Sequence, residues 1–339
     1  MSIERGFSPQ RTNELIVVGS GPAGLSAAIG GGSERLNTLV LDDRHDVGGQ
    51  ASLTSMIRNY PGFPHGVTGP DLMGAMTDQA LGFGTQFIGP SRVTNISQTA
   101  EGLSVVTEDN EFYEAKFVLI SIGVDRKPLK GRNVAAYKGR GVNYGPPSSP
   151  ESYKNKRVVV IGSGNSAGQA AYKLSEYENC EVHILIKGDS IEDNMSGYLI
   201  DELQKRNVIV HTNTQLTGVD GDGKLERVGI VDNKTQESTE LNASEVFVFI
   251  GAVPKTHWLP EAIRRDSQGY VLAGSGLPED VRGEFIEQTK GRKPLAHETS
   301  MPRVFVAGDV RSGTNKRIAL AVGDGTGVVP EIHELRAHR

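Results

Sequence analysis

The sequence predicts an α/β protein in which short buried strands alternate with helices, and three observations carry this prediction. Apolar runs rich in valine and isoleucine lead into glycine clusters and then into helix-like stretches. This strand–glycine–helix pattern occurs twice, first from residue 15 and again from residue 157. Finally, 42 of the 339 residues, or about 12%, are glycine, whereas proteins average about 7%. The glycines lie in separate clusters between the apolar runs, as expected for turns that connect strands to helices.

The composition excludes several classes of protein. The single cysteine, Cys180, rules out an intrachain disulfide, a cysteine-based zinc site and an intrachain dithiol. A net charge of −5 without a basic stripe argues against nucleic-acid binding. The histidines lack metal-ligand spacing, so no metal site is expected. Residues 1–12 are polar and no long apolar run occurs, so neither a signal peptide nor a membrane span is predicted. We therefore expect a cytoplasmic protein, with a length that favours two domains.

The first glycine cluster has the features of a phosphate-binding loop. The apolar run at residues 15–18 leads into Gly19-Ser20-Gly21-Pro22-Ala23-Gly24 and a helix-like stretch. This is a G-x-G-x-x-G loop between a strand and a helix. Gly19 permits the tight turn, Gly21 lets a pyrophosphate approach the backbone, and Gly24 allows the helix to pack closely on the strand. The beginning of the helix then offers free N–H groups and partial positive charge to the phosphates.

An acidic residue follows at the distance that a dinucleotide site requires. The next apolar run, at residues 38–41, ends in Asp42. A carboxylate about 20 residues beyond the glycines is placed to accept a hydrogen bond from a ribose hydroxyl. We therefore predict that Asp42 binds ribose. The cluster Gly30-Gly31-Gly32, near the end of the expected helix, has no functional explanation in the sequence.

A second loop of the same kind appears in the middle of the chain. The apolar run at residues 157–161 precedes Gly162-Ser163-Gly164-Asn165-Ser166-Ala167-Gly168 and another helix-like stretch. One such loop is a moderate signal, because glycine turns also occur without a ligand. Two loops, each between a strand and a helix, predict two nucleotide-binding folds in one chain.

Further motifs connect the two loops to a known family. They are Gly48-Gly49-Gln50, the stretch 59–63, Ser121-Ile122-Gly123-Val124, the stretch 249–256, and Val304 to Asp309. With the two glycine loops, this series resembles the thioredoxin-reductase-like branch of the FAD-dependent pyridine nucleotide–disulfide oxidoreductases. The resemblance implies two Rossmann-like dinucleotide-binding domains of the three-layer ββα type. The second domain, a NAD(P)H-domain-like insert at 126–249, interrupts an FAD-binding domain formed by 1–125 and 250–339.

The resemblance also implies a set of FAD contacts. Asp309 stands where the family's aspartate binds the ribityl chain. Residues 316–318 stand where a helix begins beside the flavin ring, a position that suits the negative charge of a reduced flavin. The implied cofactor-binding residues are Gly19, Gly21, Pro22, Ala23, Gly24, Asp42, Gly49, Gln50, Asn59, Gly123, Gly308, Asp309, Lys316, Arg317 and Ile318.

The sequence departs from the family at the redox centre. Thioredoxin reductases carry Cys-x-x-Cys after a Gly-Val-x-Tyr stretch, and here Gly141-Val142-Asn143-Tyr144 is followed by Gly145 and, three residues later, Ser148. Neither residue forms a thiolate or a disulfide, so no catalytic residue is assigned. Cys180 lies beyond the second loop, where we expect a packed structural residue.

The expected NADPH site is also degenerate. The family usually ends the strand after the second loop with His-Arg-Arg, which holds the 2′-phosphate, whereas this chain has Ile186-Lys187-Gly188 with Asp189 and Glu192 close by. One lysine beside two carboxylates is a poor phosphate clamp. A weak second nucleotide site would consist of Gly162, Gly164, Asn165, Ser166, Ala167 and Lys187, and whether it takes NAD(P)H stays open.

Three functional hypotheses follow. The first is a FAD-dependent oxidoreductase in which flavin is the only intrinsic redox centre. The second is a disulfide reductase that acts on an external dithiol partner, with NADPH or ferredoxin as electron donor. The third is a flavin-binding sensor or interaction protein with little turnover. The family implies a homodimer, and the sequence leaves the electron donor and acceptor open.

Overall fold

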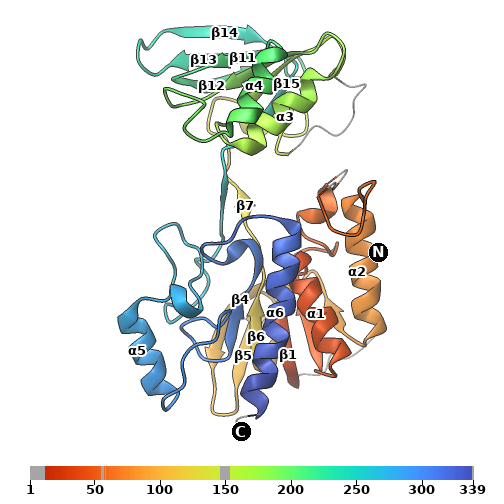
Figure 1. Ribbon diagram of the computed structural model, residues 1–339, viewed down its shortest axis with the longest axis vertical. Helices are drawn as coiled ribbons and strands as arrows, with labels where there is room; N and C mark the ends of the chain where they lie inside the picture. Colours follow the sequence, from red (N-terminus) through yellow and green to blue (C-terminus); the bar gives the residue numbers. More distant parts are fainter. Residues whose placement is uncertain (1–11, 55–56, 58, 146–152, 338–339) are drawn as a thin grey trace. The chain divides into compact units, whose positions relative to one another are not determined.

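The computed structural model describes residues 12–54, 57, 59–145 and 153–337 (Figure 1). The chain divides into two compact units, and each is described by itself. Unit 1 comprises Met1–Asp125 and Val253–Arg339, and unit 2 comprises Arg126–Ala252. Unit 2 is thus inserted into unit 1, with its second boundary three residues beyond the one expected from the sequence.

Unit 1 is built on a sheet in the order β3-β2-β1-β6-β5-β4, with β17 also pairing β6. Strands β1, β2, β3, β6 and β17 run parallel, while β4 and β5 are antiparallel. Strands β5 and β17 pair with successive parts of β6. The strands are β1 Thr12–Val18, β2 Thr38–Leu41, β3 Gln86–Ile88, β4 Val93–Gln98, β5 Leu103–Thr107, β6 Phe112–Ile120 and β17 Val304–Val306.

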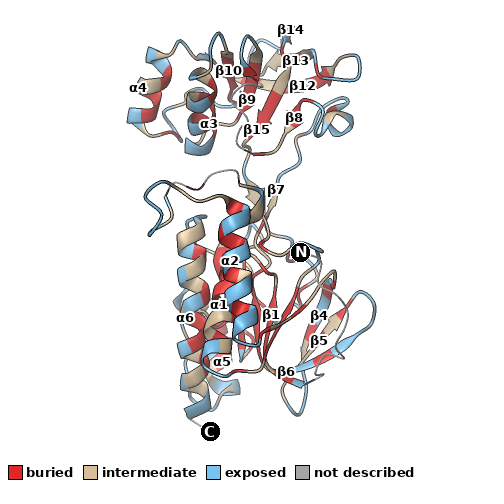
Figure 2. Cartoon of the chain, turned by 90° about the vertical axis from the view of Figure 1, so that its right-hand side faces the viewer, coloured by how far each residue is buried: buried red, intermediate tan, exposed pale blue. Residues whose placement is uncertain are grey.

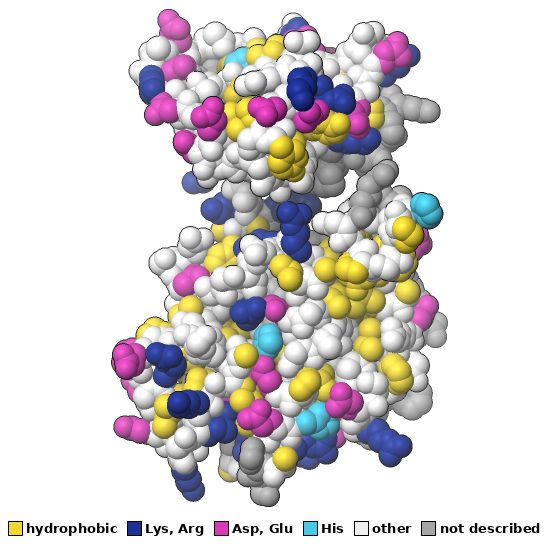
Figure 3. All heavy atoms as spheres, in the orientation of Figure 1, with side chains coloured by type: hydrophobic (Ala, Val, Ile, Leu, Met, Phe, Trp, Pro, Cys, Tyr) yellow, Lys and Arg dark blue, Asp and Glu magenta, His cyan; other side chains and the backbone are white. Residues whose placement is uncertain are grey.

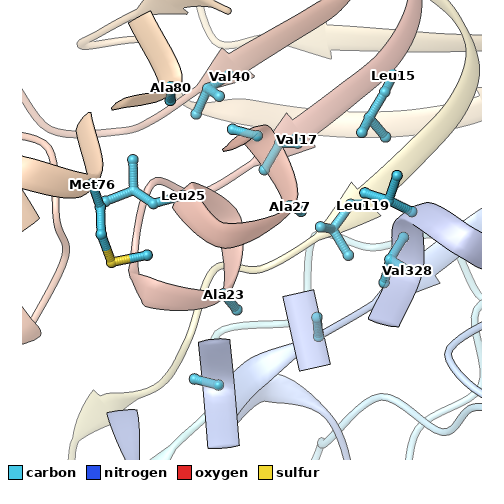
Figure 4. Packing of buried hydrophobic residues seen from close by; sticks show 14 of the residues in the cluster. Leu15, Val17, Ala23, Leu25, Ala27, Val40, Met76, Ala80, Leu119 and Val328 are labelled. Carbon is cyan, nitrogen blue, oxygen red and sulfur yellow. The ribbon is translucent and has the colours of Figure 1, made fainter. Parts of the chain in front are cut away.

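Both faces of this sheet are apolar, because successive strand residues point to opposite faces and both sets are hydrophobic. Helices cover one of the two faces. Leu15 and Val17 of β1 join a buried cluster with the helices, whereas Ile16 and Val18 join a second cluster on the opposite face. Figure 4 shows the first cluster, and Figure 2 shows that exposed residues lie on the outer sides of the helices. The helices of unit 1 are α1 Pro22–Ser33, η1 Ala51–Leu53, α2 Gly69–Gly82, η4 Gly274–Gly276, α5 Glu279–Gln288, η5 Gly308–Val310 and α6 Ile318–Ala337.

The three glycines at the end of α1 each face a different neighbour. A Cβ atom at Gly30 would lie 3.0 Å from Val329 of α6. At Gly31 it would lie 2.7 Å from the hydroxyl oxygen of Thr38 on β2, and at Gly32 it would lie 2.8 Å from Phe83, just after α2. Side chains at these positions would separate α1 from the elements around it. The cluster that the sequence left unexplained therefore serves close packing of α1.

Unit 2 has three layers. A parallel sheet in the order β11-β10-β9-β15-β8 carries α3 and α4 on one face and an antiparallel sheet, β12-β13-β14, on the other. Val158 and Val160 of β9 pack with the helices, and Val159 and Ile161 pack with the antiparallel sheet. The elements are η2 Val134–Tyr137, β8 Val142–Asn143, β9 Arg157–Ile161, α3 Asn165–Ser175, β10 Glu181–Leu185, α4 Gly197–Lys205, β11 Ile209–His211, β12 Thr214–Asp220, β13 Arg227–Asp232, β14 Ser238–Asn242 and β15 Glu245–Val248.

Two short paired strands mark the junctions between the units. They are β7, Asp125–Arg126, and β16, Ala252–Val253. The Lys127 N–H donates to the carbonyl of Gly251 at 3.0 Å, and Lys255 pairs with Asp125. The chain thus leaves and re-enters unit 1 through one pair of hydrogen-bonded segments. Among the described helices, none combines the length and apolar character that a membrane span requires.

Candidate functional site

The loop after β1 has the close packing that its glycines predict. Gly19 has a φ of +101°, and a Cβ atom there would lie 2.7 Å from the carbonyl oxygen of Ser121. A Cβ atom at Gly24 would lie only 1.9 Å from the carbonyl oxygen of Gly19. The Ser121 hydroxyl donates to that same carbonyl at 2.8 Å. These contacts fix α1 tightly against the ends of β1 and β6.

Gly21 has a different environment from the other two glycines. No heavy atom beyond its chain neighbours lies within 4 Å of where its Cβ would stand. Gly21 is also the N-cap of α1, with Pro22 following it and no side chain capping the helix. The Gly48-Gly49 turn packs close to this position, because a Cβ at Gly49 would lie 3.2 Å from the Cα of Gly21. An uncapped helix start beside open space is suited to a phosphate group.

Asp42 is held in the loop by Ser20. Its Oδ2 accepts from the backbone N–H of Ser20 at 2.6 Å and from the Ser20 hydroxyl at 2.5 Å. The N–H of Arg44 donates to Oδ1 at 2.9 Å. Burial raises the pKa of the Asp42 carboxyl, although hydrogen bonds from Ser20 and Arg44 act in the opposite direction. The carboxylate therefore lies at the loop, as a ribose contact requires.

The second aspartate, Asp309, lies in η5 beside the first turn of α1. A Cβ at Gly308 would approach that of Ala23 to 2.9 Å, so η5 and α1 meet at the loop. Burial raises the pKa of Asp309, an effect that the charge of Lys316 opposes. Within the described residues its carboxylate has no hydrogen bond or ion pair, so it is free to accept one from a ligand.

Asp324 and Glu331 of α6 form a charged cluster with His297 and Arg311, and this cluster holds η5. Asp324 accepts from the backbone N–H of Gly308 at 3.1 Å and from the guanidinium of Arg311 at 2.8 and 3.0 Å. His297 contacts Glu331 at 2.6 Å and Asp324 at 3.7 Å. Figure 3 shows histidine and acidic side chains side by side on this face of unit 1. Asp324 thereby ties the backbone of the predicted ribityl-binding motif to α6.

Neighbouring charges shift the pKa values of His297 and Asp324 in this cluster. Burial lowers the pKa of His297, but Asp324 and Glu331 outweigh it and raise the pKa to about 9. For Asp324, burial is outweighed by His297 and Arg311, which lower its pKa to about 2. The His297 imidazolium and the Asp324 carboxylate are therefore both charged at neutral pH, and their ion pair supports the loop at Gly308.

The other predicted FAD contacts are brought together less completely. Gln50 donates its side-chain amide to the carbonyl of Val124, beside Gly123. Lys316 lies 4.3 Å above the ring of Tyr270 and, with Arg317, precedes Ile318 at the beginning of α6. Asn59 is exposed, and no hydrogen bond or ion pair among the described residues joins it to the other predicted contacts.

The arrangement places these groups at one edge of the sheet. The loops after β1, β2, β6 and β17 all follow the carboxyl ends of parallel strands. The chain leaves β1 toward β2 on one side, while β6 lies on its other side, so β1 marks a change in strand order. Open α/β sheets bind ligands at such a switch point.

The second loop, in unit 2, has similar geometry. Gly162 has a φ of +143°, and a Cβ there would lie 2.4 Å from the carbonyl oxygen of Phe249. Gly164 is the N-cap of α3, with no side-chain cap, and Ala167 is buried where the first loop has its third glycine. The side chain of Asn165 is engaged by Ser196 at 2.8 and 3.0 Å, and Ser166 is exposed.

After β10, the structure differs in one detail from the predicted 2′-phosphate site at Lys187. Lys187 is exposed, and Asp189, which was expected to oppose it, forms an ion pair with Lys234 from the β13–β14 turn. The hydrogen bond from Lys234 lowers the pKa of Asp189. Lys234 is thus a second cation in this region, and no pattern in the sequence predicts its position here.

The position of the absent dithiol is partly described. Gly145 follows β8, whereas Ser148 lies outside the described residues. Cys180 packs against the helix-side core of unit 2. Burial raises its pKa to about 11, so it is almost wholly a thiol at neutral pH and a poor nucleophile.

Comparison with known proteins decides the family. The family model of the pyridine nucleotide-disulphide oxidoreductases matches residues 13–325. The chain belongs to this family. A thioredoxin reductase of Treponema pallidum is 32% identical over 312 residues, which cover 92% of this chain and 93% of that protein.

Solved structures of this oxidoreductase family agree with the fold. The thioredoxin reductase of T. acidophilum is 30% identical with a TM-score of 0.79, covering 97% of this chain and 100% of that one. The Lactococcus lactis thioredoxin reductase is 26% identical with a TM-score of 0.78, covering 96% and 100%. The predicted family and the predicted two-domain Rossmann-like fold are therefore confirmed.

Several residues of the site escaped the sequence analysis. Ser20 and Ser121 lie inside or beside recognised motifs, so their neighbours offered a signal. Asp324 and His297 offered none, because they meet the Gly308 loop only through the fold.

Proposed function

We propose that this oxidoreductase depends on FAD and uses the flavin as its only intrinsic redox centre. The observation that supports it most is the contrast between the two units. Unit 1 keeps an open, uncapped helix start at Gly21 and, within the described residues, a carboxylate without a hydrogen-bond partner at Asp309. Unit 2 has Gly145 where thioredoxin reductases carry a cysteine, and the chain's only thiol, that of Cys180, has a pKa of about 11.

The residues of unit 1 fit the parts of FAD. The pyrophosphate would lie at Gly21 and the beginning of α1, where the N–H groups point toward it. Asp42 would accept from the adenosine ribose, and Asp309 from the ribityl chain. The first turn of α6, preceded by Lys316 and Arg317, would face the ring with partial positive charge.

The chemistry would come from the cofactor, and the chain would tune and position it. Bound FAD would supply hydride and single-electron transfer. Lys316 and Arg317 favour negative charge at the ring, since both are exposed cations at a helix start. Asp324 holds the Gly308 backbone, and through it the Asp309 carboxylate, in place.

Flavin content is the first test. We expect the purified chain to be yellow and to release about one equivalent of FAD per chain on denaturation, or to take up FAD when it is added. Replacing Asp309 by alanine should weaken FAD binding, because an acceptor for the ribityl hydroxyls is lost. A colourless protein that binds no added FAD would contradict the proposal.

The electron donor is tested by anaerobic titration with NADPH, NADH and reduced ferredoxin in turn. Reduction by a pyridine nucleotide would indicate a nucleotide site. If Lys187→Ala abolished reduction by NADPH but kept reduction by NADH, that site would be assigned to unit 2. Reduction by ferredoxin only would assign a protein donor. Slow reduction by all three would favour the flavin-binding sensor.

Reduction of an external disulfide is the second candidate, favoured by the thioredoxin reductases among the relatives. The dithiol would then belong to a protein partner, since this chain has one cysteine. Donor-dependent reduction of thioredoxin should occur in the wild type and in Cys180→Ser equally. Loss of turnover in Cys180→Ser would instead make Cys180 a participant.

We also propose a cytoplasmic homodimer. Membership of this family supports the dimer, and the single cysteine fits a reducing compartment. Sedimentation of the purified chain would measure its assembly, and fractionation of cells would measure its location.

A further inference from the structure

The side chain of Arg126 takes the space next to Gly145. Arg126 lies at the end of β7, and both residues belong to unit 2. A Cβ atom at Gly145 would lie 2.5 Å from Nη1 of Arg126 and 3.1 Å from Nη2. Gly145 also has a φ of +139°, which other residues rarely adopt. The guanidinium therefore lies where any side chain at position 145 would begin.

Within the described residues, the half-buried side chain of Arg126 lacks the partner that a buried guanidinium nitrogen normally has. Its Nη1 is buried and has no hydrogen-bond partner within the part of the chain that the structure describes. Burial alone lowers its pKa, and no carboxylate opposes that effect. By contrast, the partly buried Arg311 and Arg292 each bind a carboxylate with two nitrogens. Leaving a buried cationic donor unpaired is costly, so a negative partner is expected.

Backbone contacts hold this arrangement in place. The N–H of Leu129 donates to the hydroxyl of Tyr144 at 2.8 Å, which ties the segment after Arg126 to the segment before Gly145. The N–H of Lys127 donates to the carbonyl of Gly251 at 3.0 Å. The guanidinium is thus presented from a fixed backbone and does not depend on a free loop.

The segment that follows Arg126 is basic. The chain from Arg126 to Arg140 contains four more basic residues and no acidic one. Those four and Arg140 are exposed, and Figure 3 shows Lys and Arg side chains around the junction strands. The four are Lys127, Lys130, Arg132 and Lys138. The segment that follows Arg126 therefore favours an anion over a cation, and Asp125, which precedes Arg126, is paired with Lys255.

We propose that Arg126 is the binding group of an oxyanion site in unit 2. The site takes the carboxylate or phosphate group of a small molecule beside Gly145, the position where thioredoxin reductases carry a redox cysteine. A planar guanidinium matches both groups, because each offers two oxygens to its parallel N–H donors. Glycine at position 145 leaves room for the guanidinium. The site requires neither flavin nor turnover, so it extends beyond the proposed function.

The test is an NMR titration of the full-length, ¹⁵N-labelled protein at constant ionic strength. Sodium phosphate and sodium acetate are added separately, with sodium chloride as reference. We expect saturable shifts of the Arg126 Nε–H and Gly145 N–H signals with phosphate, acetate or both. A response to one anion only identifies the headgroup that the site prefers. No saturable response beyond that of chloride would overturn the proposal.

Three variants and a control locate the binding group. Arg126→Leu should abolish the response at Gly145, and Arg126→Lys should raise the apparent Kd about tenfold, since a lysine lacks the planar fork. Gly145→Ala keeps the charge but fills the space, so the response of the Arg126 Nε–H signal should weaken. Lys205→Leu removes an exposed cation on α4 of the same unit and should change nothing.

Equal binding by wild type and Arg126→Leu would overturn the proposal. Circular dichroism of each variant checks folding, and Arg126→Lys remains informative if Gly145→Ala unfolds. Flavin content, measured on the same samples, tests the proposed function separately.

Discussion

At the scale of single residues, Gly21 and Gly24 lie in the same loop but meet different surroundings. We expect Gly24→Ala to lower the free energy of unfolding by about 3 kcal/mol or more, because its Cβ would overlap the Gly19 carbonyl. Gly21→Ala should leave that free energy within about 1 kcal/mol but weaken FAD binding at least tenfold, because the methyl group would occupy the proposed pyrophosphate position. Urea unfolding of the FAD-free chain and FAD titration measure the two effects.

This pair of variants separates a packing role from a binding role. Gly21 has a φ of −68°, which alanine adopts without strain, so a loss of stability there would have no steric cause. Wild-type FAD affinity in Gly21→Ala would argue that the pyrophosphate lies elsewhere.

Cys180 gives a second prediction at this scale. With a pKa of about 11, it should react with iodoacetamide at pH 8 more than about a hundredfold slower than an unperturbed cysteine. The rate should keep rising above pH 9, where an ordinary thiol levels off. Mass spectrometry of the alkylated chain measures it, with urea-unfolded protein as the reactive control. Rapid labelling of the folded chain would reveal an exposed thiolate and make Cys180 a catalytic candidate.

At the scale of elements, α1 is packed through its glycines. Alanine at a helical glycine normally stabilises by about 1 kcal/mol. At Gly31 and Gly32 we expect the opposite, a loss of about 1–2 kcal/mol, because the new methyl groups would press on Thr38 and Phe83. Gly74→Ala is the matched control, since Gly74 is exposed in α2 with nothing within 4 Å, and should stabilise. Urea unfolding of the three variants measures the difference, and stabilisation by all three would disprove the packing role.

The attachment of α6 to η5 should make stability depend on pH. The folded pKa of His297 is raised to about 9, so its contribution is complete below its unfolded pKa, about 6.5. That contribution is lost as the pH rises to 9, and it amounts to at most about 3 kcal/mol. His297→Gln should lose most of this pH dependence, while wild type and variant converge near pH 9.5. Urea unfolding at several pH values measures it, and parallel curves would exclude His297 as the cause.

The sequence predicted elements better than it predicted contacts between them. The strand–glycine–helix pattern is local, so both loops and the aspartates Asp42 and Asp309 were recognisable from neighbouring residues. The contact of Gly308 with Asp324 and that of Arg126 with Gly145 join different elements. Neither pair has a pattern in the chain, because a side chain's partners across the fold depend on packing that short windows do not contain. The glycines 30–32 are the same case, since their reason lies in α6, β2 and the end of α2.

At the scale of the whole molecule, the two units have separate cores. Among the described residues, four buried hydrophobic clusters each draw their members from one unit, two from unit 1 and two from unit 2. Cooperative unfolding depends on a shared core. The insertion of unit 2 through the short strands β7 and β16 therefore leaves each unit with its own source of stability.

We consequently expect two thermal transitions in calorimetry of the FAD-free chain. FAD at about a hundredfold above its Kd should stabilise unit 1 by about 2.7 kcal/mol and move only the transition that belongs to unit 1. A fragment of residues 126–252 should reproduce the other transition, because it contains both clusters of unit 2. NADPH or NADH would move that second transition only if the loop at Gly162 binds it, which gives a measure of nucleotide binding independent of turnover. A single transition that FAD moves as a whole would show that the units unfold together.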